Sequence, residues 1–309
     1  MANQTVIITG ANKGLGFECA RAIAKTDRRW HIVIACRDME RGLKSAQEIT
    51  NETDYRAISV LNLDLASLDS VNKFVSDFYA KGLPPLRGLI CNAGVYVLDG
   101  LAYTHDGFEL TFGVNYLGHF LLTNLLLDSF VEPARIVMVS SGTHNPKDAA
   151  GRFSPPVFVG AKRLAHPQGE NEMSGTQRYT TSKLCMVLSA YELDRRLKKE
   201  NRNITINAYD PSFVPGTDLL SGNVPPIIHR LLRSPVRNVL SRVLKSATST
   251  PRESGAAMAR LLLDPSLANV SGRYFQLEKE RNSSDESYDV EKAKTLWEDS
   301  LQLVGLVNL

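Results

Sequence analysis

A tyrosine and a lysine four residues apart carry the clearest chemistry in this chain. Tyr179 and Lys183 are one helical turn apart, so a helix through this stretch places both side chains on one face. A free tyrosine titrates near ~10, too high for efficient proton exchange at neutral pH, and a neighbouring ammonium lowers that value. The pair therefore predicts a group that protonates a carbonyl oxygen or deprotonates an alcohol. The alternative is a solvated helix face, because Y-x-x-x-K also occurs by chance.

Other polar residues can join this pair. Ser140 and Ser141 end a predicted strand, and Asn115 lies inside a predicted apolar helix, where an amide needs a partner or a role. We expect Ser141 to orient the substrate oxygen. We expect Asn115 to hold a water that relays protons from Lys183.

A glycine-rich turn near the N-terminus predicts a nucleotide loop. It follows the first expected strand and has the spacing G-x-x-x-G-x-G. Gly10 allows a tight turn, Gly14 lets the backbone approach a pyrophosphate, and Gly16 permits close packing of helix on strand. The helix that follows adds free N–H groups and the positive end of its dipole. Alone such a loop can be only a turn, but its place between a strand and a helix favours the nucleotide.

The end of the second strand predicts which nicotinamide is bound. An acidic residue there would accept the ribose hydroxyls of NAD. Here Arg37 is placed to hold a 2′-phosphate by a bidentate contact, and Lys13 adds a second cation. Both can also be ordinary surface charges, and Asp38 keeps NAD open as an alternative. The prediction is NADP(H).

Short polar and small residues follow the third and fourth strands. They are Asp64-Leu65 and Asn92-Ala93-Gly94. Ligands of open α/β sheets bind at this carboxyl edge. We expect Asn92 to brace neighbouring loops and Gly94 to let the backbone approach a ribose.

An alternating scaffold must bring these residues together. Apolar runs alternate with helical patterns, which predicts an α/β Rossmann fold: a doubly wound parallel sheet of about seven strands with helices on both faces. Strands are expected at 5–9, 30–36, 56–63, 88–92, 135–140, 204–209 and 274–276. Helices are expected at 14–25, 40–50, 67–79, 108–130, 179–200, 251–263 and 289–304. Residues 142–176 are too many for an ordinary connection and are expected to form a functional loop. With no linker or repeat visible, residues 1–309 are predicted to form a single domain.

Composition restricts the classes of function. The net charge is +3 without a long Lys/Arg run, which argues against nucleic-acid binding. The six histidines show no metal-ligand spacing, so no metal is expected. No secretory signal and no run of ~18 consecutive apolar residues is visible, so the expected location is cytoplasmic. The four cysteines form no C-x-x-C pair and are expected to be buried thiols: Cys19, Cys36, Cys91 and Cys185.

Taken in order along the chain, these motifs resemble those of the short-chain dehydrogenase/reductase superfamily. The match runs over nearly the whole sequence. The resemblance implies a Rossmann fold and a catalytic set of Asn115, Ser141, Tyr179 and Lys183. It also implies cofactor contacts at Gly10, Asn12, Lys13, Gly14, Leu15, Gly16, Arg37, Asp64, Leu65, Asn92, Ala93, Gly94, Asn115, Tyr179, Lys183, Pro211, Phe213, Val214 and Thr217.

Within the superfamily the sequence is most similar to light-dependent protochlorophyllide oxidoreductases, and next to the retinol dehydrogenase group. The stretches that carry this similarity are 35–38, 63–71, 91–96, 115–120 and 291–294, with Trp297. Two departures stand out. Those photoenzymes carry Pro-Gly-Cys after the sixth strand, whereas this chain has Pro211-Ser212-Phe213, and Phe213 cannot donate a proton. The loop before Tyr179 is also shorter than theirs, so the resemblance does not carry the substrate.

A segment after the sixth strand bears on the substrate. From Ile227 to Lys245 apolar residues recur at helical spacing, with arginines and a lysine between them. The segment is a core helix with a solvated basic face, a lid over the site at about 211–250, or a helix in peripheral contact with an anionic membrane. As a lid it would favour a bulky apolar or aromatic substrate.

Several other residues are candidates to line the substrate pocket. They are Phe213, Tyr96, Val97 and the 142–176 loop. Of the histidines, we expect His144 to touch the substrate.

The chain is thus predicted to be an NADP(H)-dependent enzyme. It would transfer a hydride between the nicotinamide and a carbonyl or alcohol of a bulky apolar substrate, with Tyr179 as general acid/base. One alternative is a protochlorophyllide oxidoreductase-like reductase of a conjugated double bond, which the missing cysteine argues against. Another is a non-catalytic NADP(H)-binding module. The sequence leaves the oligomeric state open, and a homodimer formed through the two long helices is an alternative that rests on analogy with relatives alone.

Overall fold

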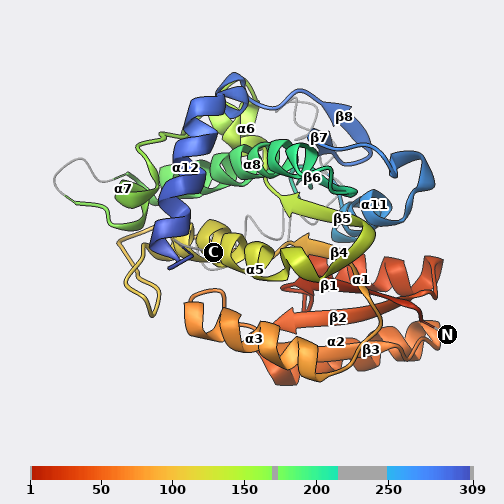
Figure 1. The fold of residues 1–309 in the computed structure, drawn as a ribbon. Coiled ribbons are helices and arrows are strands. Elements are labelled where there is room, and N and C mark those ends of the chain that lie inside the picture. The colour runs from red at the N-terminus through yellow and green to blue at the C-terminus, as the bar shows by residue number, and fades with distance from the viewer. Residues whose placement is uncertain (1, 169–172, 215–248, 307–309) are drawn as a thin grey trace, which may run out of the picture.

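Eight strands form one sheet in the order β3-β2-β1-β4-β5-β6-β7-β8 (Figure 1). The computed structural model describes residues 2–168, 173–214 and 249–306. Strands β1 to β7 run parallel and β8 pairs antiparallel with β7. Their bounds are β1 Gln4–Thr9, β2 Trp30–Cys36, β3 Ile58–Asn62, β4 Leu86–Cys91, β5 Phe130–Val139, β6 Ile204–Asp210, β7 Arg273–Gln276 and β8 Lys279–Arg281.

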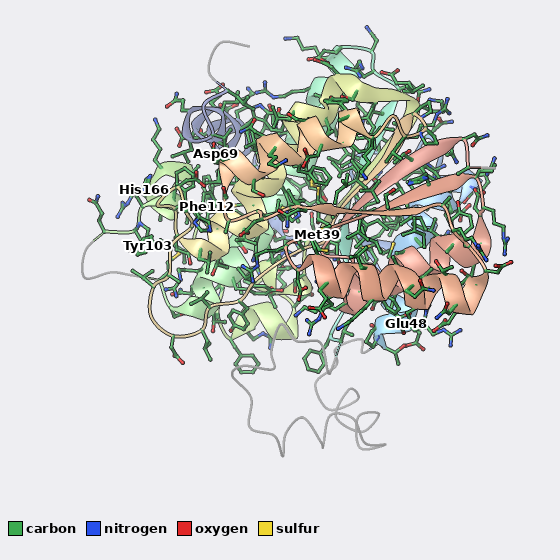
Figure 2. The ribbon with its side chains drawn as sticks, turned by 90° about the horizontal axis from the view of Figure 1, so that it is seen from below. Met39, Glu48, Asp69, Tyr103, Phe112 and His166 are labelled. Carbon is green, nitrogen blue, oxygen red and sulfur yellow. The ribbon has the colours of Figure 1, made fainter. Side chains whose placement is uncertain are left out.

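Helices cover both faces of the sheet and define two apolar cores. One core joins the strands to α3, α5 and α8, and the other joins them to α1 and α11. Asp69 of α3 and Met39 of α2 lie on opposite sides of the strands in Figure 2. The long helices are α1 Gly14–Thr26, α2 Met39–Thr53, α3 Leu68–Ala80, α5 Gly118–Leu126, α8 Gly175–Lys199, α11 Pro251–Leu263 and α12 Val290–Leu303. Short ones are α4 Leu110–Phe112, α6 Ala149–Arg152 and α7 Ala161–Ala165.

The strand order creates the crevice that the sequence motifs require. From β1 the chain continues to β2 and β3 in one direction, and β4 then pairs with the other side of β1. The loops after β1 and β4 therefore diverge, and ligands of open parallel sheets bind at such a switch point. The prediction of a doubly wound α/β fold is confirmed.

Several predicted elements differ from the observed ones; strand β5, for example, begins at Phe130 and not at residue 135. The eighth strand, Lys279–Arg281, was not predicted because its three residues are polar and exposed. The expected helix 108–130 is divided into α4, a wide π-helical turn at Gly113–Leu117, α5 and a 3-10 turn. Helix α8 begins four residues earlier than expected, at Gly175, because Ser174 and Gln177 form a capping box.

Helical stretch Leu110–Ser129 is apolar enough by length and composition to cross a membrane, the single such case among the described residues. However, 78% of its most apolar window is buried inside the protein, so packing in the core accounts for its composition. The four cysteines are buried free thiols, as predicted.

Helix α12 packs over α8 and α5, on the side of these helices that faces away from the sheet (Figure 1). Trp297 meets the ring of Phe120 edge-on with centroids 4.8 Å apart, and the Arg196 guanidinium lies 4.9 Å from the Trp297 ring. The Tyr116 hydroxyl also hydrogen-bonds Ser300 Oγ at 3.0 Å. The last helix is thus part of the core.

The predicted lid at 211–250, with its basic helix 227–245, lies outside the described residues except at its two ends. These ends are joined to each other. Ser249 N donates to the Phe213 carbonyl at 3.0 Å, and Ser249 Oγ donates to the Pro211 carbonyl at 2.9 Å. The segment therefore leaves and rejoins the described structure at one point, next to the end of β6.

Candidate active site

An open cleft of about 710 Å³ lies at the carboxyl edge of the sheet. It runs from the glycine-rich turn after β1 to the polar face of α8. The predicted cofactor residues that line it are Gly10, Asn12, Lys13, Gly14, Leu15, Arg37, Asp64, Leu65, Asn92, Ala93, Gly94, Tyr179, Lys183 and Pro211. The structure thus brings residues from both halves of the chain to one site.

The glycine-rich turn has the backbone geometry that its sequence predicts. Gly10 and Gly14 have φ of +67° and +57°, in the left-handed region that favours glycine. A Cβ on Gly16 would lie 2.8 Å from the Gly10 carbonyl oxygen, so only glycine allows this approach of α1 to the turn. The first turn of α1 contains no acidic residue, so its N-terminus is suited to a phosphate.

A hydroxyl that the sequence did not single out holds the edges of β1 and β4 together. Thr9 Oγ1 accepts hydrogen bonds from the backbone N–H groups of Asn92 and Ala93 at 2.8 and 2.9 Å. His119 Nε2 lies 2.8 Å from the same hydroxyl, and His119 Nδ1 lies 3.0 Å from the Asn115 carbonyl. Burial lowers the pKa of His119 to about 4, so the ring is neutral and structural. Asn92 Nδ2 adds a bond to the Thr9 carbonyl at 2.8 Å, which is the predicted bracing.

Three cations line the end of the cleft next to β2. Arg37 and Lys13 were predicted there, and Arg41 from the first turn of α2 joins them. Asp38, the residue that kept NAD open, is the N-cap of α2, and its Oδ1 accepts from Arg41 N at 2.9 Å. Because its carboxylate caps a helix beside these cations, this end of the cleft suits a phosphate better than a pair of hydroxyls.

The predicted catalytic pair lies on the second and third turns of α8. The Lys183 ammonium is 5.6 Å from the Tyr179 ring centroid and donates to the Val139 carbonyl at 3.1 Å. The Ser141 side chain lies near enough to the Tyr179 phenol to lower its pKa by hydrogen bonding, whereas the Ser140 hydroxyl donates to the Lys183 carbonyl at 2.8 Å. The structure therefore joins Ser141, and not Ser140, to the tyrosine.

The electrostatics of the pair differ from the expected ones. Burial raises the pKa of the Tyr179 phenol above its ordinary value, and the hydrogen bond from Ser141 offsets this only in part. Desolvation is the largest of these effects, and the expected lowering by Lys183 is not among them. Burial also lowers the pKa of Lys183 to about 8. Both groups are protonated at neutral pH.

Asn115 sits in the middle of the π-helical turn and is completely buried. Its Oδ1 accepts from Val95 N at 2.7 Å, and its Nδ2 donates to the Val95 carbonyl and to Ser182 Oγ, both at 3.0 Å. The expected water relay through Asn115 is not supported, because its amide is bonded to protein and its carbonyl faces His119. Asn115 instead connects the loop after β4 to α8.

The remaining predicted residues lie beside the cleft and do not form its wall. Gly16 and Asn115 are buried behind it, and Phe213 and Val214 follow Pro211 at the base of the segment outside the described residues. Thr217 is outside the described residues. Sequence reasoning missed Arg41 and Pro251 as lining residues. The signals available in the sequence were a second arginine in the first turn of α2 and a proline at the start of α11.

Apolar and aromatic side chains line the cleft beside the catalytic pair. They are Val95, Tyr96, Leu110 and Val114. The Tyr96 ring packs on the Tyr179 ring with centroids 4.8 Å apart, and its hydroxyl hydrogen-bonds Thr176 Oγ1 at 2.9 Å.

The expected contact of His144 with the substrate is wrong. This side chain is fully buried, and its two ring nitrogens meet the Ser141 carbonyl at 2.7 Å and Ser284 N at 3.1 Å.

The comparisons with known proteins agree with this geometry. A family model described as short chain dehydrogenase matches residues 4–151, and one described as AcuH dehydrogenase domain matches residues 222–308. The chain is 36% identical to protochlorophyllide reductase A, chloroplastic, of Oryza sativa subsp. japonica, across 98% of this chain and 81% of that protein.

Solved structures share the fold. An uncharacterized protein from Mycobacterium paratuberculosis is 28% identical, with a TM-score of 0.71 over 98% of this chain and 94% of that one. The NADPH-bound carbonyl reductase from chicken fatty liver is 16% identical, with a TM-score of 0.63 over 92% of this chain and 100% of that one. With its sequence motifs, its fold and its relatives in agreement, the chain belongs to the short-chain dehydrogenase/reductase family, near the protochlorophyllide reductases.

Proposed function

We propose that this NADP(H)-dependent oxidoreductase reduces a carbonyl group of a bulky apolar substrate, with Tyr179 as the proton donor. The observation that carries the proposal is that Tyr179 and Lys183 line one end of the cleft, with the Ser141 side chain next to Tyr179. When bound, the nicotinamide supplies the hydride. The protein supplies the proton, from the Tyr179 hydroxyl to the substrate oxygen, and Ser141 orients that oxygen by a hydrogen bond.

The cations at the other end of the cleft support the choice of cofactor. Arg37, Arg41 and Lys13 can share the charge of a 2′-phosphate, and the N-terminus of α1 can bind the pyrophosphate. Lys183, at the catalytic end, would hold the nicotinamide ribose. The carbonyl reductase with the same fold was solved with NADPH bound.

The protonated state of Tyr179 is the one that a proton donor needs. An acid whose pKa is raised by burial keeps its proton at neutral pH and releases it only to an atom that gains negative charge. A carbonyl oxygen that receives a hydride on its carbon is such an atom. Oxidation of an alcohol would require the phenolate, which is scarce at this pH.

The character of the substrate is inferred from the wall beside Tyr179. The side chains of Val95, Leu110 and Val114, with the Tyr96 ring, offer apolar area to a ligand. Burial of such area contributes ~25 cal/mol per Å² to binding, which favours large aromatic or aliphatic ketones over small polar ones.

Replacement of the proposed acid tests the mechanism. We would follow NADPH oxidation against retinoids, steroids, aromatic ketones and quinones, with wild type and Tyr179→Phe. Loss of a positioned acid costs ~10²–10⁴-fold in rate, so the variant should lose nearly all turnover and still bind NADPH. Tyr103→Phe, at an exposed tyrosine, is the matched control and should keep wild-type turnover. Turnover by Tyr179→Phe within tenfold of wild type would overturn the assignment.

A second candidate is reduction of a conjugated double bond in a tetrapyrrole. It is favoured by 36% identity to a protochlorophyllide reductase over 98% of this chain. Phe213 argues against this candidate. The photoenzymes carry a cysteine at this position, whereas a phenylalanine side chain has no proton to donate. A light-dependent absorbance change of protochlorophyllide with NADPH would establish this activity; no change under light would exclude it.

A further inference from the structure

A buried carboxylate lies beside the catalytic residues. Asp210 is the last residue of β6 and is 1% exposed. The register of β5 and β6 pairs Val139 with Tyr209, and Ser140 N donates to the Tyr209 carbonyl at 2.7 Å. The residues that follow this pair are Ser140 after β5 and Asp210 at the end of β6, and Ser141 comes next after Ser140. The Lys183 ammonium binds the Val139 carbonyl. On the neighbouring strand, Asp210 follows Tyr209, the residue that pairs with Val139.

The partners of Asp210 are neutral. Its Oδ1 accepts from Ser212 N at 2.8 Å, and its Oδ2 accepts from Gln276 Nε2 at 3.0 Å. The Oδ2 atom also lies 3.1 Å from where a Cβ on Gly142 would stand, next to Ser141. A buried carboxylate with neutral donors alone is costly, and a cation in its vicinity reduces that cost.

Five titratable groups face this carboxylate from the elements packed against it. Among them Lys183 alone is a cation at neutral pH, because burial lowers the pKa of His144 and the others are acids or phenols. They are Lys183 and Tyr179 on α8, Tyr274 on β7, and His144 and Asp148 in the segment after β5.

We propose that Asp210 is a positioning residue, the buried counter-charge that keeps Lys183 protonated and able to hold the cofactor ribose at neutral pH. Its negative charge opposes the effect of burial on the lysine, whose pKa stays at about 8. The same charge raises the pKa of Tyr179 and so keeps the proton on the donor. This role rests on the proposed function, in which Lys183 holds the ribose.

The test measures NADPH affinity as a function of pH, so it needs no substrate. NADPH fluorescence would be titrated with wild type and Asp210→Asn from about pH 7 to 10, where the 2′-phosphate, with a second pKa near ~6, is already ionised. Wild-type affinity should fall through the lysine pKa, which is about 8. In Asp210→Asn the midpoint should move down by roughly one pH unit, which makes NADPH binding about threefold weaker near pH 7.5.

The asparagine is isosteric, and Gln276 can turn its amide to donate to or accept from it. If it does not fold, Asp210→Ser removes the same charge with a smaller side chain and should show the same shift. Asp54→Asn is the control, because this carboxylate is exposed at the C-cap of α2, and its midpoint should stay at the wild-type value. Lys183→Met should abolish the pH step.

The outcomes separate the two proposals. An unchanged midpoint in folded Asp210→Asn or Asp210→Ser overturns the role of Asp210. A pH step that survives in Lys183→Met also overturns it, because the lysine then does not report on binding. Failure of wild type to bind NADPH at any pH overturns the proposed function itself.

Discussion

Ser212 adopts a backbone conformation that its side chain disfavours. Its φ is +63°, and its hydroxyl is buried without a hydrogen-bond partner among the described residues. A left-handed conformation costs an L-residue ~1–2 kcal/mol, and a buried unsatisfied hydroxyl adds to that cost. The photoenzymes that this chain resembles carry glycine at this place, next to Pro211, which lines the cleft.

Replacement of this serine by glycine should stabilise the protein. Ser212→Gly removes the strain and the unpaired hydroxyl, against the greater freedom of glycine in the unfolded chain, for a net gain of about 1 kcal/mol. Urea unfolding measures the change. Ser76→Gly, on the exposed face of α3, is the control and should lose about 1 kcal/mol. A loss in both variants would show that Ser212 is not strained.

At this scale the sequence predicted most of the residues that line the cleft, and few of the residues that hold them in place. Tyr179, Lys183 and the glycine-rich turn were found because their spacing along the chain is their signal. Thr9 and Asp210 act on residues more than twenty positions away, so their roles depend on strand pairing and burial, which local patterns do not contain. For the same reason the sequence could not predict that burial would raise the pKa of Tyr179.

Helices α1 and α11 pack closely against each other. A Cβ on Gly255 would lie 2.4 Å from the Cβ of Glu18 and 2.8 Å from Cys19 N. The two helices flank the cleft, because α1 begins at the glycine-rich turn and Pro251 of α11 lines the wall. A side chain at Gly255 would force the helices apart.

Gly255→Ala should therefore destabilise the protein although alanine is the better helix former. Alanine gains up to ~1 kcal/mol in helix propensity, while backbone displacement in a packed core costs ~1–3 kcal/mol. We expect a net loss of about 1–2 kcal/mol in the free energy of unfolding, measured with urea. Ala256→Gly, one position along on the exposed side of α11, tests propensity alone. Stabilisation by Gly255→Ala would mean that the helices can separate at no cost.

The elements were predicted well where the pattern is long. Strand β2 and helix α11 have the predicted bounds, since a buried apolar run and a proline start are strong local signals. The division of the helix at Gly113–Leu117 carries no such signal. It widens the backbone so that one amide can reach two other segments, a requirement set by tertiary structure.

In the whole molecule, other elements cover the long helices through which such a dimer would form. Apart from its first turns and its last, α8 is buried almost throughout, and Trp297 of α12 packs on α5 through Phe120. The homodimer that analogy with relatives offers would need the surface of α8 and α5 to be exposed.

We therefore expect a monomer in solution. Light scattering after size exclusion should give the mass of one chain, 34.1 kDa. Trp297→Ala, which opens the contact with α5, should lower stability by ~3–5 kcal/mol for the loss of a buried tryptophan. A mass near twice that of the chain for the wild type would show that copies pair through another surface.

The amide of Asn115 has a consequence for the speed of cofactor capture. It already holds the loop after β4 against α8 before any ligand arrives. Segments that are fixed in advance need not be ordered by an incoming molecule, so the conformational entropy is lost once, when the chain folds. Each cofactor molecule then binds to a site that is already formed, and a single collision in the right orientation can suffice.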